Sequence, residues 1–152
     1  MACDISTKAC GWAIFKGRQR AASGTIKPPA GWKRYRRLGL IFLDLSALVK
    51  QHEAECMAIE EAFVSGGHAR NRSTGVALGG ARAVAEVVAA GRQMPEPMYI
   101  KPSEVRSMIG VGGRATKEQV RAMVAAYFGF QPGSFDESDA VALGWAATMK
   151  RR

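Results

Sequence analysis

The sequence predicts an α/β fold in which helices flank a five-stranded mixed β-sheet, with the elements in the order βββαβαβαα. The first 26 residues alternate short β-type runs with turn residues, whereas later segments repeat apolar residues at helical spacing. Two further short apolar runs lie between those helical segments and complete the sheet. No linker or internal repeat divides residues 1–152, so we expect a single domain.

An antiparallel meander is expected at the start of the chain. Met1–Ile5, Gly11–Lys16 and Ala21–Ile26 favour strands, and a basic turn joins the last two of them. Pro28 and Pro29 then end the meander, because proline has no N–H group to donate to a sheet.

A first helix is predicted over Trp32–Lys50. Its apolar residues Leu38, Phe42, Leu45 and Val49 recur at spacings of three and four residues. This spacing is typical of a helix that buries one face, so we expect these side chains to pack against the sheet.

The middle of the chain predicts a buried strand and a second helix. Cys56–Glu60 is short and almost wholly apolar, which is typical of a strand covered on both faces. The polar segment Ser65–Thr74 predicts a flexible loop, and an Ala-rich helix follows to about Gly91.

The last third of the chain begins with one more strand, Met98–Ile100, after which Pro102 is typical of a helix start. Gly110–Gly113 predicts a loop. A capping box then opens a helix over Thr116–Phe128, and a final helix spans Ser134–Met149.

The composition excludes several classes of protein. The sequence has no run of 18 apolar residues and no secretory signal at its amino terminus, so we expect a cytoplasmic protein with no membrane contact. Cys3, Cys10 and Cys56 lack a Cys-x-x-Cys spacing, and His52 and His68 stand far apart. Neither a zinc or redox site nor a Ser-His-Asp triad is expected, so any chemistry would depend on carboxylates.

Four acidic residues occupy positions that burial alone does not explain: Asp4, Glu60, Asp136 and Asp139. Asp4 lies in the first predicted strand, Glu60 ends the central one, and the other two share one face of the last helix. Adjacent strands crossed by that helix would bring all four together. Because grouped carboxylates repel one another and Mg²⁺ and Mn²⁺ prefer oxygen ligands, this arrangement predicts a two-ion site for phosphodiester hydrolysis.

Each acid also has a purely structural interpretation. Asp136 can cap the last helix, with Asp139 favourably placed in its first turn, and Asp4 can close a turn through its side chain. Glu60 is harder to explain in this way, because no Lys or Arg of its own segment is near enough to pair with it. Strand alternation sends Glu60 and Glu61 to opposite faces and leaves open which of them faces the site.

The net charge of +9, from 22 Lys and Arg against 13 Asp and Glu, favours a phosphate-rich partner. Basic residues crowd the start of the first predicted helix, although the helix dipole favours acids there. This face either binds DNA phosphates or is simply solvated. Its basic residues are Lys33, Arg34, Arg36 and Arg37, interleaved with Trp32 and Tyr35.

Two predicted loops carry further basic residues. The polar segment after the central strand offers Arg70 and Arg72 to DNA, unless it is merely a mobile connection. Gly110–Gly113 is interpreted as a turn that brings Arg114 and Lys117 to the DNA, because no Gly-Lys-Ser/Thr follows to make a phosphate-binding loop.

Five groups of residues lie along nearly the whole chain: Asp4-Ile-Ser with Gly11-Trp-Ala, Ala58-Ile-Glu60-Glu-Ala-Phe63, Ala77-Leu-Gly-Gly-Ala-Arg82, Val105–Gly113 with Lys117, and Asp136-Glu-Ser-Asp139-Ala-Val-Ala-Leu143. In this order and spacing they resemble the RuvC family of Holliday junction resolvases. The family belongs to the RNase H-like superfamily, and the chain is most similar to its short bacteriophage-type members. The resemblance implies an RNase H-like fold.

The resemblance also implies roles for individual residues. It selects Glu60 over Glu61 as a metal ligand, and it places Phe63 near the open centre of a bound junction. Arg106 and Lys117 match basic positions beside the scissile phosphate. The implied catalytic set is Asp4, Glu60, Asp136, Asp139 and Lys117, in which the four acids hold two Mg²⁺ or Mn²⁺ ions.

Two positions depart from the family pattern. Asp4 is followed by Ile5 and Ser6, where many members have Pro-Gly. Arg106 stands where Lys is usual, and a planar guanidinium differs from a point charge. The first departure bears on metal affinity, and the second on how the phosphate is held.

The resemblance implies a homodimer that binds a four-way DNA junction and cuts two opposing strands, leaving 5′-phosphate and 3′-hydroxyl ends, without an organic cofactor. Such a protein acts in the cytoplasm of a bacterium or a phage-infected host. The Ala-rich helix over Thr74–Ala90 is the predicted dimer interface, because small side chains permit close approach. Two other functions stay open: a related nuclease acting on flaps, replication forks or RNA–DNA hybrids, and a non-catalytic, structure-selective DNA-binding module.

Overall fold

A computed structural model of the chain describes residues 1–61 and 69–150. Its strands are β1 (Ala2–Ile5), β2 (Cys10–Lys16), β3 (Gln19–Ile26), β4 (Ala58–Glu60) and β5 (Met98–Ile100). Its helices are α1 (Arg34–Gln51), α2 (Ala69–Gly91), α3 (Pro102–Met108), α4 (Lys117–Phe128) and α5 (Phe135–Lys150). In the described parts of the chain, no helix combines the length and apolar character that crossing a membrane requires.

The strands form one sheet in the order β3-β2-β1-β4-β5. The first three strands are antiparallel neighbours, whereas β4 runs parallel to both β1 and β5. The predicted five-stranded mixed sheet flanked by helices is therefore confirmed.

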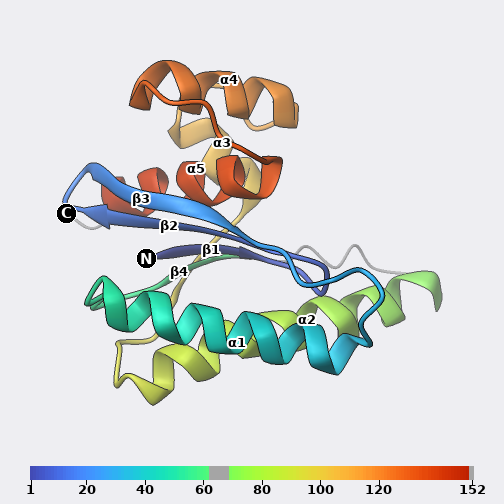
Figure 1. Cartoon of the computed structure of the whole chain (residues 1–152). Coiled ribbons are helices and arrows are strands. Elements are labelled where there is room, and N and C mark those ends of the chain that lie inside the picture. Colours follow the sequence, from blue (N-terminus) through green and yellow to red (C-terminus); the bar gives the residue numbers. More distant parts are fainter. Residues whose placement is uncertain (62–68, 151–152) are drawn as a thin grey trace.

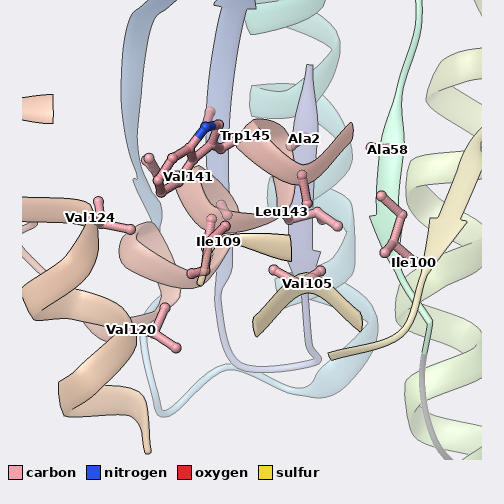
Figure 2. Close-up of a cluster of buried hydrophobic side chains, with 14 residues drawn as sticks. Ala2, Ala58, Ile100, Val105, Ile109, Val120, Val124, Val141, Leu143 and Trp145 are labelled. Atoms are coloured by element: carbon pink, nitrogen blue, oxygen red, sulfur yellow. The ribbon is translucent and has the colours of Figure 1, made fainter. Parts of the chain in front are cut away.

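Helices cover both faces of the sheet, with α1 and α2 on one side and α3, α4 and α5 on the other (Figure 1). Alternation along the strands divides the core accordingly. Cys3 and Ile59 pack on the side of α1 and α2, whereas Ala2 and Ala58 pack with α5. Figure 2 shows this second cluster, in which Leu143 of α5 gathers with Ile100 of the sheet and Val120 of α4.

Helix α5 contacts all five strands and lies especially close to β2. A Cβ atom built on Gly11 would overlap the backbone carbonyl of Asp136, and one built on Gly144 would overlap the ring of Phe15. Glycine at these two points lets the helix backbone rest directly on β2. The small residues of the sequence thus serve a helix-to-sheet contact that larger side chains would prevent.

The structure corrects the predicted order of elements, because three helices rather than two follow β5. The helix missing from that order is α3, which begins at Pro102, where the sequence indicated a helix start, and is followed by Gly110 with φ at 85°. Proline suits the first turn of a helix, and glycine adopts positive φ at little cost.

The predicted loop over Ser65–Thr74 is also wrong in its second half, since α2 already begins at Ala69. The remainder of that loop lies outside the described residues. The polar residues at the start of α2 carry little apolar periodicity, so the sequence pattern starts the helix one turn or more too late.

The buried stripe of α1 differs by one position from the predicted one. Ile41, Leu45 and Val49 are buried, whereas Phe42 is 37% exposed. Ile41 and Phe42 are adjacent apolar residues, so spacing alone does not decide which of them faces the sheet.

We predict that Gly11→Ala lowers the free energy of unfolding by about 1–3 kcal/mol or more, because the added methyl group must displace the start of α5. Gly39→Ala, in exposed α1 with open space around it, is the matched control and should raise stability by about 0.5–1 kcal/mol. Urea denaturation measures both changes. Equal stabilisation by the two variants would contradict the close contact at Gly11.

Candidate active site

Two neighbouring strands place acidic side chains on the same face of the sheet. Asp4 follows Ala2 by two residues in β1, and Glu60 follows Ala58 by two residues in β4. Ala2 pairs with Ala58 and both pack toward α5, so strand alternation turns Asp4 and Glu60 toward α5 as well. Glu61 is thereby directed to the opposite face.

Helix α5 brings two more carboxylates to these strand ends. Asp4 pairs with Gly11 in the sheet, and the backbone of Asp136 rests on that same glycine. Asp139 lies one turn further along α5 and interacts electrostatically with both Asp4 and Glu60. The structure therefore brings together the four acids that the sequence predicted to converge.

The electrostatics of this cluster are unfavourable to ionised carboxylates. Burial, followed by the charges of Glu60 and Asp139, raises the pKa of Asp4 from its ordinary value of 3.8 to about 8. Burial and Asp139 likewise raise the pKa of Glu60 to about 7, although Lys117 and Arg106 oppose this. Both acids thus retain protons near neutral pH unless cations compensate the charge.

Serine residues, and not Asp4 or Asp136, close the turn after β1 and cap the start of α5. The turn after β1 is closed by Ser6, whose Oγ accepts hydrogen bonds from the N–H groups of Lys8 and Ala9. At the start of α5, Ser134 Oγ accepts a hydrogen bond from the N–H of Glu137 at 3.0 Å. Neither a turn at Asp4 nor a helix cap at Asp136 is needed to explain the local structure.

Lys117 supplies a cation at the cluster. Its Nζ donates a hydrogen bond to Asp139 Oδ2 at 2.7 Å. Desolvation acts to lower the pKa of Lys117, but the hydrogen bond and the charge of Asp139, together with Asp4, raise it overall. The ammonium group is therefore held in its charged form beside the carboxylates.

Helix α4 orients Lys117 through its own cap. Thr116 and Gln119 form the predicted capping box, in which the Thr116 side chain accepts from the N–H of Gln119 and the Gln119 side chain accepts from that of Thr116. Lys117 is the first residue of α4, so this cap defines where its side chain leaves the backbone.

The donor set suits a hard divalent cation. In residues 1–61 and 69–150, no three His, Cys, Asp or Glu side chains stand close enough to form a ready-made metal cluster. The four converging side chains nevertheless offer only carboxylate oxygens, and two of them have strongly raised pKa values. A cation between them would stabilise the ionised carboxylates against the burial and the repulsion that raise those pKa values.

The remaining predicted residues lie around this centre. Arg106 lies in the last turn of α3 and acts electrostatically on Glu60, whereas Arg114 is exposed between α3 and α4. The loop before Arg114 contains Gly110 and Gly112, both with positive φ, as the predicted turn requires. Lys33, Arg34 and Arg36 are exposed at the start of α1, and Arg37 is half-buried there.

The structure does not describe the side chains of three residues that were predicted to bind DNA. Phe63 lies outside the described residues. Arg70 and Arg72 belong to α2 by their backbone, but their side chains are likewise outside the described part.

Gly11 is the residue that sequence reasoning missed at this site. It was placed in a strand and in the family motif with Asp4 but was given no packing role, yet it allows α5 to carry Asp136 to within reach of Asp4. A glycine inside a strand often marks a close backbone approach, and this was the available signal.

Comparison with known proteins agrees with this arrangement. A family model described as Crossover junction endodeoxyribonuclease RuvC matches residues 1–147. The chain belongs to the RuvC family. Nucleases of this family are metal-dependent.

Curated relatives and solved structures support the same family and fold. Proteins with that name from Moorella thermoacetica and Rubrobacter xylanophilus are 35% and 32% identical to this chain, over 92% and 98% of its length and 84% of each relative. A structure of T. thermophilus RuvC in complex with a Holliday junction substrate has a TM-score of 0.80 at 21% identity, covering 99% of this chain and 94% of that one. The expected RNase H-like fold is confirmed.

We predict that the metal-free protein loses stability as the pH rises. A carboxyl whose pKa is about 8 in the folded state and 3.8 ordinarily binds its proton more tightly when folded. Its stabilising contribution is complete below about pH 4 and is lost as the pH rises through about 8. In EDTA, the free energy of unfolding should therefore fall between pH 5.5 and pH 8.5 by about 1–3 kcal/mol.

Asp4→Asn should remove much of this decrease, whereas Asp44→Asn, a control in α1, should keep it. Thermal and urea denaturation at both pH values measure the difference. An identical pH dependence in wild type and Asp4→Asn would contradict the proposed origin of the raised pKa.

Proposed function

We propose that this chain is a divalent-metal-dependent endonuclease that resolves four-way DNA junctions by cutting two opposing strands. Membership of the RuvC family supports the activity, and relatives of this chain are named crossover junction endodeoxyribonucleases. The observation that carries the proposal is the convergence of four carboxylates from β1, β4 and α5. Burial and the charges of their neighbours raise the pKa values of two of them, Asp4 and Glu60.

We assign the metal ligands to Asp4, Glu60, Asp136 and Asp139, which would hold two Mg²⁺ or Mn²⁺ ions. When bound, such ions lower the pKa of an attacking water and stabilise the leaving oxygen in phosphodiester hydrolysis. Glu60 is preferred to Glu61 because it shares the face of Asp4.

The chain's own cations orient the phosphate. Lys117 is held at the carboxylates by its bond to Asp139, so its ammonium group can bind a non-bridging oxygen of a phosphate placed there. Arg106 acts on the same site from α3 and, as a planar guanidinium, can bind two phosphate oxygens at once. Cleavage at the 3′ oxygen would leave 5′-phosphate and 3′-hydroxyl ends.

The surrounding basic surface would bind the DNA backbone. The starts of α1, α2 and α5 lie at the same end of the sheet as the ends of β1 and β4 (Figure 1). Basic residues at the starts of α1 and α2, and one in the loop between α3 and α4, would each contribute a phosphate contact, and Phe63 would stack on bases at the open junction centre. The assigned phosphate contacts are Lys33, Arg34, Arg36, Arg37, Arg70, Arg72 and Arg114.

Two alternatives are less well supported. A non-catalytic DNA-binding module would have no use for four converging acids, which contribute to the raised pKa values of Asp4 and Glu60. A nuclease that acts on flaps or forks would share the same carboxylates, so only the choice of DNA separates it from the proposal.

We also propose a homodimer, because paired cuts on a two-fold symmetric junction need two equivalent sites. The exposed face of α2 supports this assignment. Val76 and Val87 are 68% and 56% exposed. Between them, Gly80 and Ala83 are small and also exposed. A second copy of α2 could approach this face closely.

We predict that Asp139→Asn abolishes cleavage, by about a thousandfold or more, while junction binding stays nearly unchanged. Metal binding depends on the carboxylates, whereas affinity for DNA depends on the basic surface. Labelled four-way, flap and linear DNA, incubated with Mg²⁺, Mn²⁺ or EDTA, measure cleavage and specificity together. Asp44→Asn is the matched control and should cut normally. Full activity in EDTA would remove the metal-nuclease proposal.

Val87→Asp should convert the dimer to monomers, because it places a charge in an apolar contact between two helices. Leu43→Asp, at a side chain 63% exposed on α1, is the control and should remain dimeric. Sedimentation velocity distinguishes the two states. A monomeric wild type that still cuts both strands in concert would argue against the dimer.

A further inference from the structure

Two aromatic side chains are exposed at the start of α1. Trp32 is 40% exposed and Tyr35 is 68% exposed. A turn holds Trp32 ahead of the helix, since its N–H donates a hydrogen bond to the carbonyl of Pro29 at 3.1 Å. Neither ring contacts another aromatic ring in the part of the chain that the structure describes.

Unpaired cations surround these rings. Lys33, Arg34 and Arg36 are exposed, and the first turn of α1 contains no acidic residue. Across residues 1–61 and 69–150, none of these three side chains forms an ion pair. Exposed aromatic faces between free cations are the chemistry that binds unpaired bases together with their phosphates.

This surface lies at the same end of the sheet as the carboxylates. Strand β3 ends at Ile26, which pairs with Cys10, and Cys10 in turn pairs with Ile5, the neighbour of Asp4. Only residues 27–33 separate the end of β3 from α1. DNA whose branch point is bound at the carboxylates can therefore extend over the start of α1.

We propose that Tyr35 and Trp32 stack on unpaired bases of a single-stranded DNA segment beside the branch point, while Lys33, Arg34 and Arg36 bind its phosphates. This inference rests on the proposed function and narrows its substrate class. The preferred substrate is branched DNA that carries a single-stranded segment next to the branch. A fully paired duplex arm presents no free base face, so it engages only the cations.

An exposed apolar stripe continues along α1 and offers a different use for the same face. Phe42 and Leu43 are 37% and 63% exposed, about two turns beyond Tyr35. A protein interface centred on this stripe would leave the cations around Tyr35 uncompensated, whereas nucleic acid compensates them. Charge therefore favours DNA as the occupant.

The test compares Tyr35→Ala with Tyr35→Phe in the full chain, using Leu43→Ala as the matched control on the same helix. Fluorescence anisotropy measures the affinity for oligo(dT), for an intact four-way junction and for a junction with one single-stranded arm. Tyr35→Ala should weaken binding to oligo(dT) and to the single-stranded arm about tenfold, without changing the salt dependence. Tyr35→Phe and Leu43→Ala should bind like wild type, because each keeps the aromatic ring at position 35.

Other outcomes overturn specific statements. If Tyr35→Ala binds oligo(dT) like wild type while wild type cuts junctions, the stacking role is wrong and the proposed function stands. If Tyr35→Ala changes the oligomeric state by sedimentation but not DNA affinity, the face is a protein interface and the inference is wrong. If wild type cuts no branched DNA while oligo(dT) binding still depends on Tyr35, the proposed function fails and the base-stacking surface stands.

Discussion

The contact between the backbone of α5 and Gly11 is the constraint on which the rest of the site depends. Any side chain at that position would push the start of α5 away from β2. Gly11 is also the sheet partner of Asp4, so the glycine that receives the helix lies directly beside the first acid. Gly11 thus fixes both the strand pairing beside Asp4 and the close approach of α5. Together these two contacts bring four acids that are distant in sequence into one cluster.

That cluster opposes the stability of the fold that builds it. Burial and mutual repulsion both favour protonated carboxyls at Asp4 and Glu60. The buried apolar residues of α5, β1 and β4 on either side of the cluster offset this cost. Lys117 offsets part of the repulsion, but its short bond is to Asp139 alone. The fold is therefore stable without a cation, while the uncompensated repulsion among the carboxylates favours the binding of one.

Much of this arrangement follows from local sequence pattern. Alternation and turn residues predicted the sheet, and the position of Glu60 at the end of an apolar run indicated its importance. Pattern could not choose between Glu60 and Glu61, because that choice depends on the pairing of Ala2 with Ala58, which are far apart in sequence. The burial of Ile41 instead of Phe42 escaped prediction because tertiary contacts decide between adjacent apolar residues. The early start of α2 escaped it because the polar residues there carry little apolar periodicity. The role of Gly11 depends on a helix that begins more than a hundred residues later.

The two-sided burial of α5 has a consequence for how the protein moves. Ser138 and the residues from Ala140 to Ala146 are buried, with the sheet beneath them and α3 and α4 above. We expect the buried part of a helix enclosed in this way to open only when the whole domain unfolds, which anchors the segment that carries Asp136 and Asp139. Helix α4, in contrast, packs chiefly on α5 and can shift as a peripheral unit. We therefore expect slow local motion at the site to move Lys117 with α4, and not the acidic side chains of α5.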